Sequence, residues 1–197
     1  MFRIIEFSDK VRVNPEYLSK DTKKSIQMSL AKKYENKIMK DIGVVMSIID
    51  INNIGESEIK VADPGVYYYA DFKALAYTPM LHEIVEGEVV DITNFGVFVR
   101  FGPIDGLCHI SQVIDDYISF DEKSKVLNAK DSTKKLKVGD QVRARIIAIS
   151  LDKKEVNKIN LTMRQPELGA LAWIEDDRTQ KEKAAKKETA STKSGKK

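Results

Sequence analysis

"FGVFVRFGPIDGLCHIS", residues 95–111, is the stretch that decides the fold of the second half of this chain. Side chains along a β-strand alternate between its two faces, so Val97, Val99 and Phe101 share one face. Phe98 and Arg100 then share the other face. If the first set packs in a core, the strand presents an aromatic ring beside a cation on its outer surface, and the question is what that pair binds.

The same segment belongs to a series of short strands within residues 81–174. Apolar alternation with glycine at the corners predicts strands at residues 83–92, 95–101, 105–110, 141–151 and 158–164, and a polar excursion at 115–139. Five short strands of this kind are typical of a small closed barrel such as the OB-fold. Gly96 permits a bulge at the start of its strand, which would turn Phe95 toward the same outer face as Phe98.

Residues 1–80 show a different pattern, in which one helix accompanies several strands. A first strand ends at Asn14-Pro15, and apolar residues at helical spacing predict a helix over 21–40 that Gly43 terminates. We then expect a strand at 44–51 that is buried on both faces, a turn at 52–56, a short strand at 57–61 and a long strand at 66–79. The sequence therefore predicts an α+β N-terminal domain, with one main helix on a small antiparallel sheet, followed by an all-β five-stranded OB-fold barrel.

The long strand of the first domain carries a run of aromatic residues on both of its faces. Tyr68, Ala70 and Phe72 share one face, whereas Tyr67 and Tyr69 share the other. One set is expected to pack beneath the helix. The outer set either faces solvent or contacts another protein, because tyrosine is enriched at protein interfaces.

The charge of the chain is uneven although its net charge is only +3. The excess lies in residues 175–197, which hold eight Lys or Arg against five Asp or Glu and contain no aromatic residue. Such a composition predicts a disordered tail or a fraying helix, serving either as a solubilising tail or as a non-specific electrostatic arm for nucleic acid. We therefore divide the chain into domains at 1–80 and 81–174 and a charged tail at 175–197.

Several functional classes find no support in the residues. No apolar run reaches the roughly 18 residues of a membrane span, and the N-terminus does not resemble a signal peptide. The single cysteine, Cys108, fits a reducing, cytoplasmic location. Cys108, His82 and His109 lack metal-ligand spacing, and no nucleotide-binding or nucleophile motif is present, so we expect no metal, no cofactor and no catalytic residue.

The outer face of the barrel has the composition of a single-strand-binding surface. Stacking of a base on an aromatic side chain contributes roughly 1–3 kcal/mol and needs no particular base sequence, while neighbouring cations bind phosphates. The candidate RNA-binding residues are Phe95, Phe98 and His109 as aromatic rings, and Arg100, Arg143, Arg145 and Lys158 as cations. In the alternative interpretation the phenylalanines cover the end of the barrel or meet another subunit, and His109 is a hydrogen-bonded surface residue.

The segment "EGEVVDITNFGVFVRFGPIDGLCHISQV" resembles the RNA-binding domain named after ribosomal protein S-one. The family pattern of G-x-V, F-G-x-F-V and G-L-x-H-x-S is matched at residues 87–89, 95–99 and 106–111. The resemblance implies that Phe95, Phe98 and His109 face RNA. The family often has Asp and Arg on its last strands, where this chain has Ser150 and Lys158.

Over residues 1–176 the chain also resembles the E-prime family, the larger stalk subunits of archaeal DNA-directed RNA polymerases. The resemblance is carried by "KYENKIMKDIGVVMSIIDI", "VGDQVRARIIAIS" and "INLTMRQPELGALAWIE". It implies a non-catalytic subunit that docks on the polymerase core, forms a heterodimer with the smaller stalk subunit and touches single-stranded nascent RNA. The family's acidic Gly-Asp-Gly turn is replaced here by Asp63-Pro64-Gly65, which with Tyr67 and Tyr69 forms the candidate partner-binding set. A free-standing RNA-binding module, or an accessory one of a translation or RNA-decay complex, is the alternative.

Overall fold

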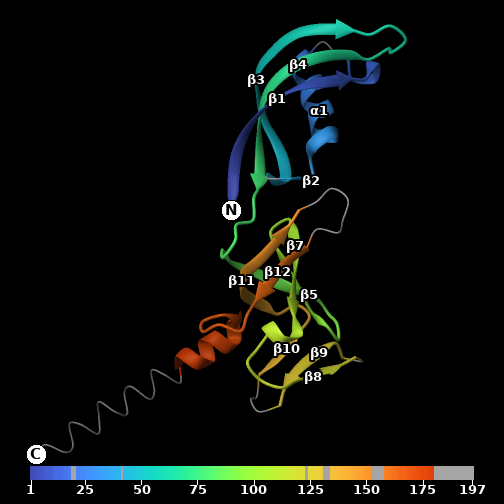
Figure 1. Ribbon diagram of the computed structural model, residues 1–197. Helices are drawn as coiled ribbons and strands as arrows, with labels where there is room; N and C mark the ends of the chain where they lie inside the picture. The colour runs from blue at the N-terminus through green and yellow to red at the C-terminus, as the bar shows by residue number, and fades with distance from the viewer. Residues whose placement is uncertain (19–20, 41, 123, 131–133, 152–157, 180–197) are drawn as a thin grey trace, which may run out of the picture. The chain divides into compact units, whose positions relative to one another are not determined.

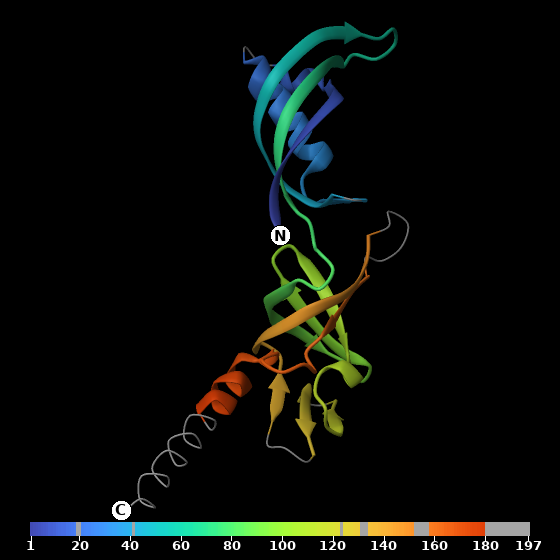
Figure 2. The same cartoon turned by 60° about the vertical axis from the view of Figure 1, so that its left-hand side comes forward.

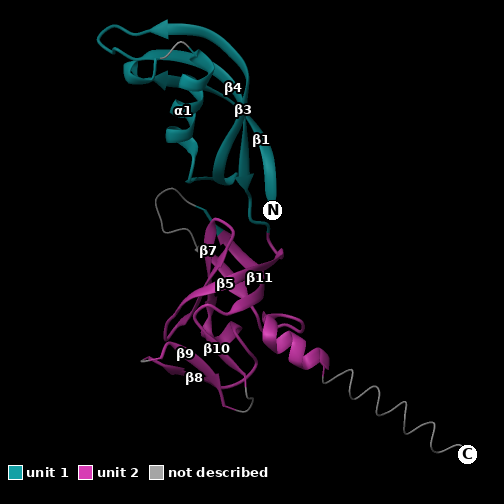
Figure 3. Cartoon of the chain, turned by 180° about the vertical axis from the view of Figure 1, so that it is seen from behind, with its two compact units in different colours: residues 1–80, 150–157 teal, residues 81–149, 158–197 magenta. Residues whose placement is uncertain are grey.

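The computed structural model describes residues 1–18, 21–40, 42–122, 124–130, 134–151 and 158–179. The chain divides into two compact units, Met1–Met80 with Ser150–Asn157 and Leu81–Ile149 with Lys158–Lys197, which are coloured separately in Figure 3. Each unit has a sheet and buried apolar side chains of its own.

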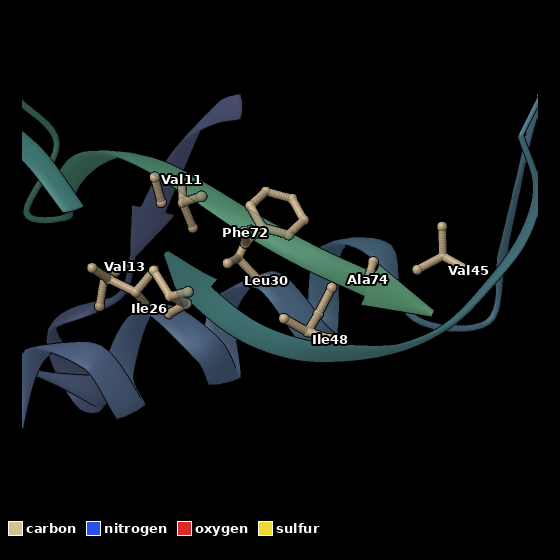
Figure 4. Packing of buried hydrophobic residues seen from close by; sticks show 10 residues of the cluster. Val11, Val13, Ile26, Leu30, Val45, Ile48, Phe72 and Ala74 are labelled. Carbon is tan, nitrogen blue, oxygen red and sulfur yellow. The ribbon is translucent and has the colours of Figure 1, made fainter. Parts of the chain in front are cut away.

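The first unit is a four-stranded antiparallel sheet with one helix, α1, packed on one face (Figure 1). The strand order is β1-β4-β3-β2, so the first strand pairs with the last. The core lies between α1 and the sheet, where Phe72 and Leu30 are fully buried (Figure 4). The elements are β1 (Phe2–Val13), η1 (Pro15–Tyr17), α1 (Thr22–Tyr34), β2 (Lys37–Met39), β3 (Gly43–Ile59) and β4 (Val66–Tyr77).

Helix α1 begins where Asp21 accepts a hydrogen bond from the backbone N–H of Lys24 at 3.3 Å, which satisfies one of the free N-terminal donors. It ends at Tyr34, so the predicted helix over 21–40 is too long. Asn36 has a φ of 59° and leaves the helical conformation, and its N–H bonds the carbonyl of Val45. The following residues pair with β3 as the short strand β2.

Strand β3 curves along β4 because its register shifts at four places (Figures 1 and 2). At each of the first three shifts, three residues of β3 lie opposite two of β4, so the buried side chains recur every third residue, at Val45, Ile48 and Ile51. The predicted turn at 52–56 is wrong, since the strand continues through it. The predicted burial on both faces is also wrong, because Ile49 is 46% exposed.

The second unit contains the predicted five-stranded barrel. Its strands follow the order β12-β7-β6-β5-β11, and pairing of β12 with β11 closes the ring. β7 and β12 run parallel, while the β5–β6, β6–β7 and β5–β11 pairs are antiparallel. The strands are β5 (Ile84–Ile92), β6 (Gly96–Phe101), β7 (Ile104–His109), β11 (Gln141–Ser150) and β12 (Lys158–Thr162), and β13 (Gly169–Ala170) pairs with β11 outside the ring.

The alternation along β6 agrees with the sequence. Val97, Val99 and Phe101 are buried, whereas Phe98 is half-buried and Arg100 is exposed. The bulge predicted at Gly96 is absent, because the β6–β7 register is regular throughout, and the irregularity lies in β5 between Val89 and Asp91. Glycine is needed at 96 for another reason: a Cβ there would lie 2.5 Å from the carbonyl oxygen of Cys108.

The excursion at 115–139 is not merely polar connection. It forms a second sheet in the order β10-β9-β8, which the sequence analysis missed. Its strands are β8 (Ile118–Asp121), β9 (Val126–Ala129) and β10 (Lys135–Lys137), and a 3-10 turn, η2 (Ile110–Gln112), precedes them. Leu127 and Leu136 are buried, so this sheet has an apolar side.

Residues 171–179 are helical, which includes the first part of the tail predicted to be disordered or a fraying helix. Arg178 there forms an ion pair with Glu167 at 2.8 Å. The remainder of that prediction, residues 180–197, lies outside the described residues. None of the described helices is long and apolar enough to cross a bilayer.

Candidate nucleic-acid interface

Two phenylalanines meet at the edge of the barrel. The rings of Phe95 and Phe98 lie edge to face, with centroids 6.0 Å apart and planes at 88°. This is a favoured aromatic geometry, because the positive edge of one ring faces the negative face of the other. Phe95 is 47% exposed and Phe98 is half-buried, so the pair keeps aromatic surface open to a ligand.

The turn between β5 and β6 fixes Phe95 without the predicted bulge. Both the N–H and the hydroxyl of Thr93 donate to the carbonyl of Gly96, at 2.9 Å each. The carbonyl of Phe95 accepts from the N–H of Ile110 at 3.0 Å, which ties the turn to the end of β7. The position of Phe95 therefore depends on backbone hydrogen bonds to two elements.

His109 ends β7 and stands opposite Gly96 in the β6–β7 register. Its Nδ1 accepts from the N–H of Ser111 at 3.3 Å and lies 2.8 Å from the Ser111 hydroxyl. Because Nδ1 accepts the amide proton, the neutral ring carries its own proton on Nε2. The imidazole is thus held by hydrogen bonds and exposed, on the strand that pairs with that of Phe98. We call Phe95, Phe98 and His109 the barrel aromatic face.

The predicted cations of the barrel are less free than the sequence suggests. Arg100 forms a bidentate pair with Asp105, directly opposite on β7, with Nε–Oδ1 at 2.8 Å and Nη2–Oδ2 at 3.0 Å. Arg143 pairs with Glu86, opposite on β5, where its Nε and Nη2 both contact Oε1, at 2.8 and 2.7 Å. Each arginine is therefore neutralised by a carboxylate on the neighbouring strand.

The other two predicted cations, Arg145 and Lys158, differ from Arg100 and Arg143. Arg145 is half-buried opposite Ile84, and its Nε is buried without a hydrogen-bond partner among the described residues. Since β5 lies between β6 and β11, the β11 arginines are one strand away from Phe98. Lys158 begins β12, and its side chain lies outside the described part of the structure.

The second sheet adds residues that the sequence analysis did not single out. A pocket of about 370 Å³ lies between the β5–β6 turn and the β8–β9 hairpin. Within it, Lys125 forms an ion pair with Asp91 at 2.7 Å, which holds the pKa of that carboxyl below its usual range. We call it the hairpin pocket, and its lining residues are Asp91, Ile92, Thr93, Asn94, Phe95, Phe120, Glu122 and Lys125.

The only thiol of the chain does not take part in any such site. Cys108 is fully buried, and desolvation raises the pKa of its thiol to about 12. A thiol with this pKa stays protonated and is a poor metal ligand. Across the described residues, no group of three or more His, Cys, Asp or Glu side chains is arranged to hold a metal ion.

In the first unit, Asp63 organises the turn before β4. Its carboxylate accepts from Arg12 Nε at 2.8 Å, from the N–H of Gly65 at 2.9 Å and from the Tyr67 hydroxyl at 2.7 Å. The Arg12 guanidinium, with these hydrogen bonds, holds the pKa of Asp63 far below its usual range. Pro64 stands between Asp63 and Gly65 without interrupting this network.

The outer side of β4 carries Tyr67 and Tyr69, which we call the tyrosine face. Lys60 Nζ lies 4.5 Å from the Tyr67 ring centroid, and Lys10 Nζ lies 5.0 Å from that of Tyr69. Tyr68 packs on the opposite side, against the core, as the strand alternation predicts. Just beyond, at the β3–β4 turn, Val61 is fully exposed, an apolar side chain that the sequence analysis did not single out.

Comparison with protein-family models gives two matches, one mainly in the first unit and one mainly in the second. Residues 8–65 match the model of the SHS2 domain found in the N terminus of Rpb7p/Rpc25p/MJ0397. Residues 78–162 match the S1 RNA binding domain. The second match covers the barrel, the second sheet and every residue of the barrel aromatic face.

Comparison with individual proteins gives matches over most of the chain. The DNA-directed RNA polymerase subunit Rpo7 of Sulfolobus acidocaldarius is 40% identical over 177 residues, 90% of this chain and 97% of that protein. The DNA-directed RNA polymerase III subunit RPC8 of Bos taurus is 26% identical, over 75% of each chain. A solved structure of Mycoplasma genitalium RNase R with single-stranded RNA is 30% identical over 42% of this chain and 13% of that one, with a TM-score of 0.37, a likeness too limited to support an inference.

Proposed function

The chain belongs to the Rpo7 family of archaeal DNA-directed RNA polymerase subunits, and on this premise we propose that it is a non-catalytic stalk subunit that binds nascent RNA. Its first unit docks on the polymerase core and holds the smaller stalk subunit. Its barrel binds the single-stranded transcript through the barrel aromatic face.

The observation that carries the RNA-binding proposal is the geometry of Phe95 and Phe98. Their edge-to-face contact holds two rings at fixed positions, with His109 on the adjoining strand, so little side-chain freedom is lost when a base stacks there. Stacking of this kind contributes roughly 1–3 kcal/mol per base and tolerates any sequence. A surface that must contact every transcript needs such tolerance.

The ion pairs of the barrel affect how strongly RNA binding depends on salt. Because Asp105 and Glu86 neutralise Arg100 and Arg143, these two arginines are less available to attract phosphates. Affinity that comes mainly from stacking depends only weakly on salt. The expected interaction is modest in affinity, which suits a strand that must move past the surface during elongation.

Support for docking by the first unit comes from the turn at residues 60–65. The Asp63 network joins this turn to Arg12 on β1, so the turn is rigid before any partner arrives. Beside it, Ile59 and Val61 are exposed apolar side chains that a partner can cover. The tyrosine face adjoins the same turn, and tyrosine is a frequent interface residue.

Co-elution tests the proposal most directly. The full chain is mixed with an archaeal polymerase core that lacks its stalk, with and without the smaller stalk subunit, and separated by gel filtration. We expect it to elute with the core, most completely when the smaller stalk subunit is present. Elution as a free protein in both cases, with RNA binding intact, would contradict the docking proposal.

A second function is favoured by the same ion pairs. A barrel surface with neutralised arginines and an exposed phenylalanine is also suited to a protein partner, such as the smaller stalk subunit or a transcription factor. In that case Phe98→Ala would release the protein partner and leave RNA crosslinking unchanged. The proposed function requires the reverse outcome.

A further inference from the structure

The hairpin pocket is a concave site next to the barrel aromatic face. We propose that it holds one unpaired base of an RNA strand whose neighbouring base stacks on Phe98, and that it takes a base with an exocyclic amino group in preference to uracil. This inference rests on the proposed function. At about 370 Å³ the pocket lies within the usual size range of small-molecule sites, roughly 300–1,000 Å³.

Phe95 connects the pocket to the barrel face. It lines the pocket and also meets Phe98 edge to face at 6.0 Å, so the two sites share one ring. Phe120, from β8, supplies a second aromatic side chain to the lining. A strand that places one base on Phe98 therefore brings its next base to a site with two more rings, without leaving aromatic surface.

The charge of the pocket favours a base over a phosphate. Among the lining residues that the structure describes, Asp91 and Glu122 contribute two carboxylates against the single ammonium of Lys125. The ammonium already pairs with Asp91 at 2.7 Å. A phosphate would therefore meet the second carboxylate, that of Glu122, whereas a base is neutral and brings no such repulsion.

Two polar side chains of the lining are available to read the edge of that base. Glu122 and Asn94 are exposed, and neither has a hydrogen-bond partner among the described residues. A carboxylate only accepts hydrogen bonds, so Glu122 pairs with the exocyclic amino group of cytosine, adenine or guanine. The carbonyl groups of uracil give it no donor at an equivalent position.

Fluorescence anisotropy of labelled single-stranded RNA, with the full chain, tests the aromatic part of the proposal. Phe120→Leu keeps an apolar side chain on β8 but removes the ring, and we expect RNA binding to weaken roughly fivefold or more. Tyr117→Leu is the matched control, because Tyr117 is 77% exposed just before the same strand but does not line the pocket. Its affinity should equal that of the unchanged chain.

Phe98→Leu, measured beside them, separates this inference from the proposed function. If Phe98→Leu binds RNA weakly while Phe120→Leu binds normally, the barrel face binds RNA and the pocket proposal is overturned. If both variants bind as the unchanged chain does, the RNA-binding function fails and the pocket proposal fails with it. Circular dichroism of each variant checks that the fold is intact.

Glu122→Gln tests the base preference at an exposed position where the fold is not at stake. The unchanged chain should bind an oligouridine carrying one cytidine about fivefold more tightly than oligouridine itself, the value of one hydrogen bond. Glu122→Gln should reduce this ratio to less than about twofold, because an amide both donates and accepts. Equal affinity of the unchanged chain for the two RNAs would overturn the assigned preference.

Discussion

The tyrosine face of the first unit and the barrel aromatic face of the second use the same residue classes in opposite ways. On the tyrosine face, Lys60 lies over the ring of Tyr67 and Lys10 over that of Tyr69. Asp63 accepts a hydrogen bond from the hydroxyl of Tyr67. On the barrel, Arg100 and Arg143 pair with carboxylates of neighbouring strands, and no cation from the described residues lies over Phe95 or Phe98.

The difference shows how one set of residues can produce two kinds of surface. Cations placed over aromatic rings fix the rings and cover part of their faces, which gives a rigid surface suited to lasting contact with a protein. Cations held by cross-strand carboxylates leave the rings uncovered, which gives a surface suited to exchangeable stacking. The following predictions test this contrast, from the largest expected effect to the smallest.

The largest effect is expected from the core of the first unit. Phe72 is fully buried and stacks on Phe7 at 5.5 Å, so Phe72→Ala should cost about 3–5 kcal/mol of that unit's stability. Trp173, the single tryptophan, lies in the second unit and reports its unfolding separately. Urea denaturation followed by circular dichroism should shift while tryptophan fluorescence does not. A joint shift of both signals would show that the units do not unfold independently.

The second prediction compares the two faces by removing one aromatic ring from each. Phe98→Ala removes one ring of the barrel aromatic face and should weaken single-stranded RNA binding by roughly 1–3 kcal/mol, with co-elution with the polymerase core unchanged. Tyr69→Ala is the matched change on the tyrosine face and should weaken co-elution while sparing RNA binding. Anisotropy and gel filtration measure the two effects. If each variant impaired both activities, the division of labour between the faces would be refuted.

The third prediction concerns pH and the turn at residues 60–65. The folded pKa of Asp63 lies below its value in the unfolded chain, about 3.9, so its stabilising contribution is fully present above that pH and is lost as the pH falls through the folded pKa. Asp63→Asn lacks this contribution and should melt at a lower temperature at pH 7. The gap between the two melting temperatures should narrow below about pH 4. A gap that stays constant down to pH 2 would mean that another carboxylate, and not Asp63, is responsible for the loss of stability in acid.

The smallest effect is expected from the ion pairs of the barrel. Asp105→Asn removes the carboxylate from Arg100 and frees its guanidinium for a phosphate. The slope of log affinity against log salt should become steeper by about 0.7, the value for one added contact to single-stranded nucleic acid. Glu86→Gln should do the same for Arg143. An unchanged slope in both variants would place these arginines outside the path of the RNA.

The sequence predicts the barrel well because alternation and glycine are local signals. Val97, Val99 and Phe101 face the core as their spacing requires, and Gly96 stands where a side chain has no room. The same reasoning fails for strand β3. From Val45 to Ile51 its buried residues recur every three positions, a period that belongs to neither a regular strand nor a helix, so the sequence does not reveal the bulges, which depend on the pairing with β4.

The candidate site was predictable in its rings but not in its charges. The positions of Phe95, Phe98 and His109 follow from one continuous motif, whereas the pairing of Arg100 with Asp105 depends on the register between two strands. The same holds for Arg143 and Glu86, which are far apart in the sequence. Phe120 was missed because β8 has only four residues, too few to show alternation within a polar segment.

The repeated bulges of β3 have a mechanical consequence for the part of the molecule that we assign to docking. β3 has seventeen residues and β4 has twelve, so β3 is the longer, outer strand of a bent hairpin and β4 the inner strand. The angle at which the hairpin carries Ile59 and Val61 is then determined by how many extra residues β3 contains. Removing one of them, such as Ile49, would redirect the turn without altering a single residue of its surface.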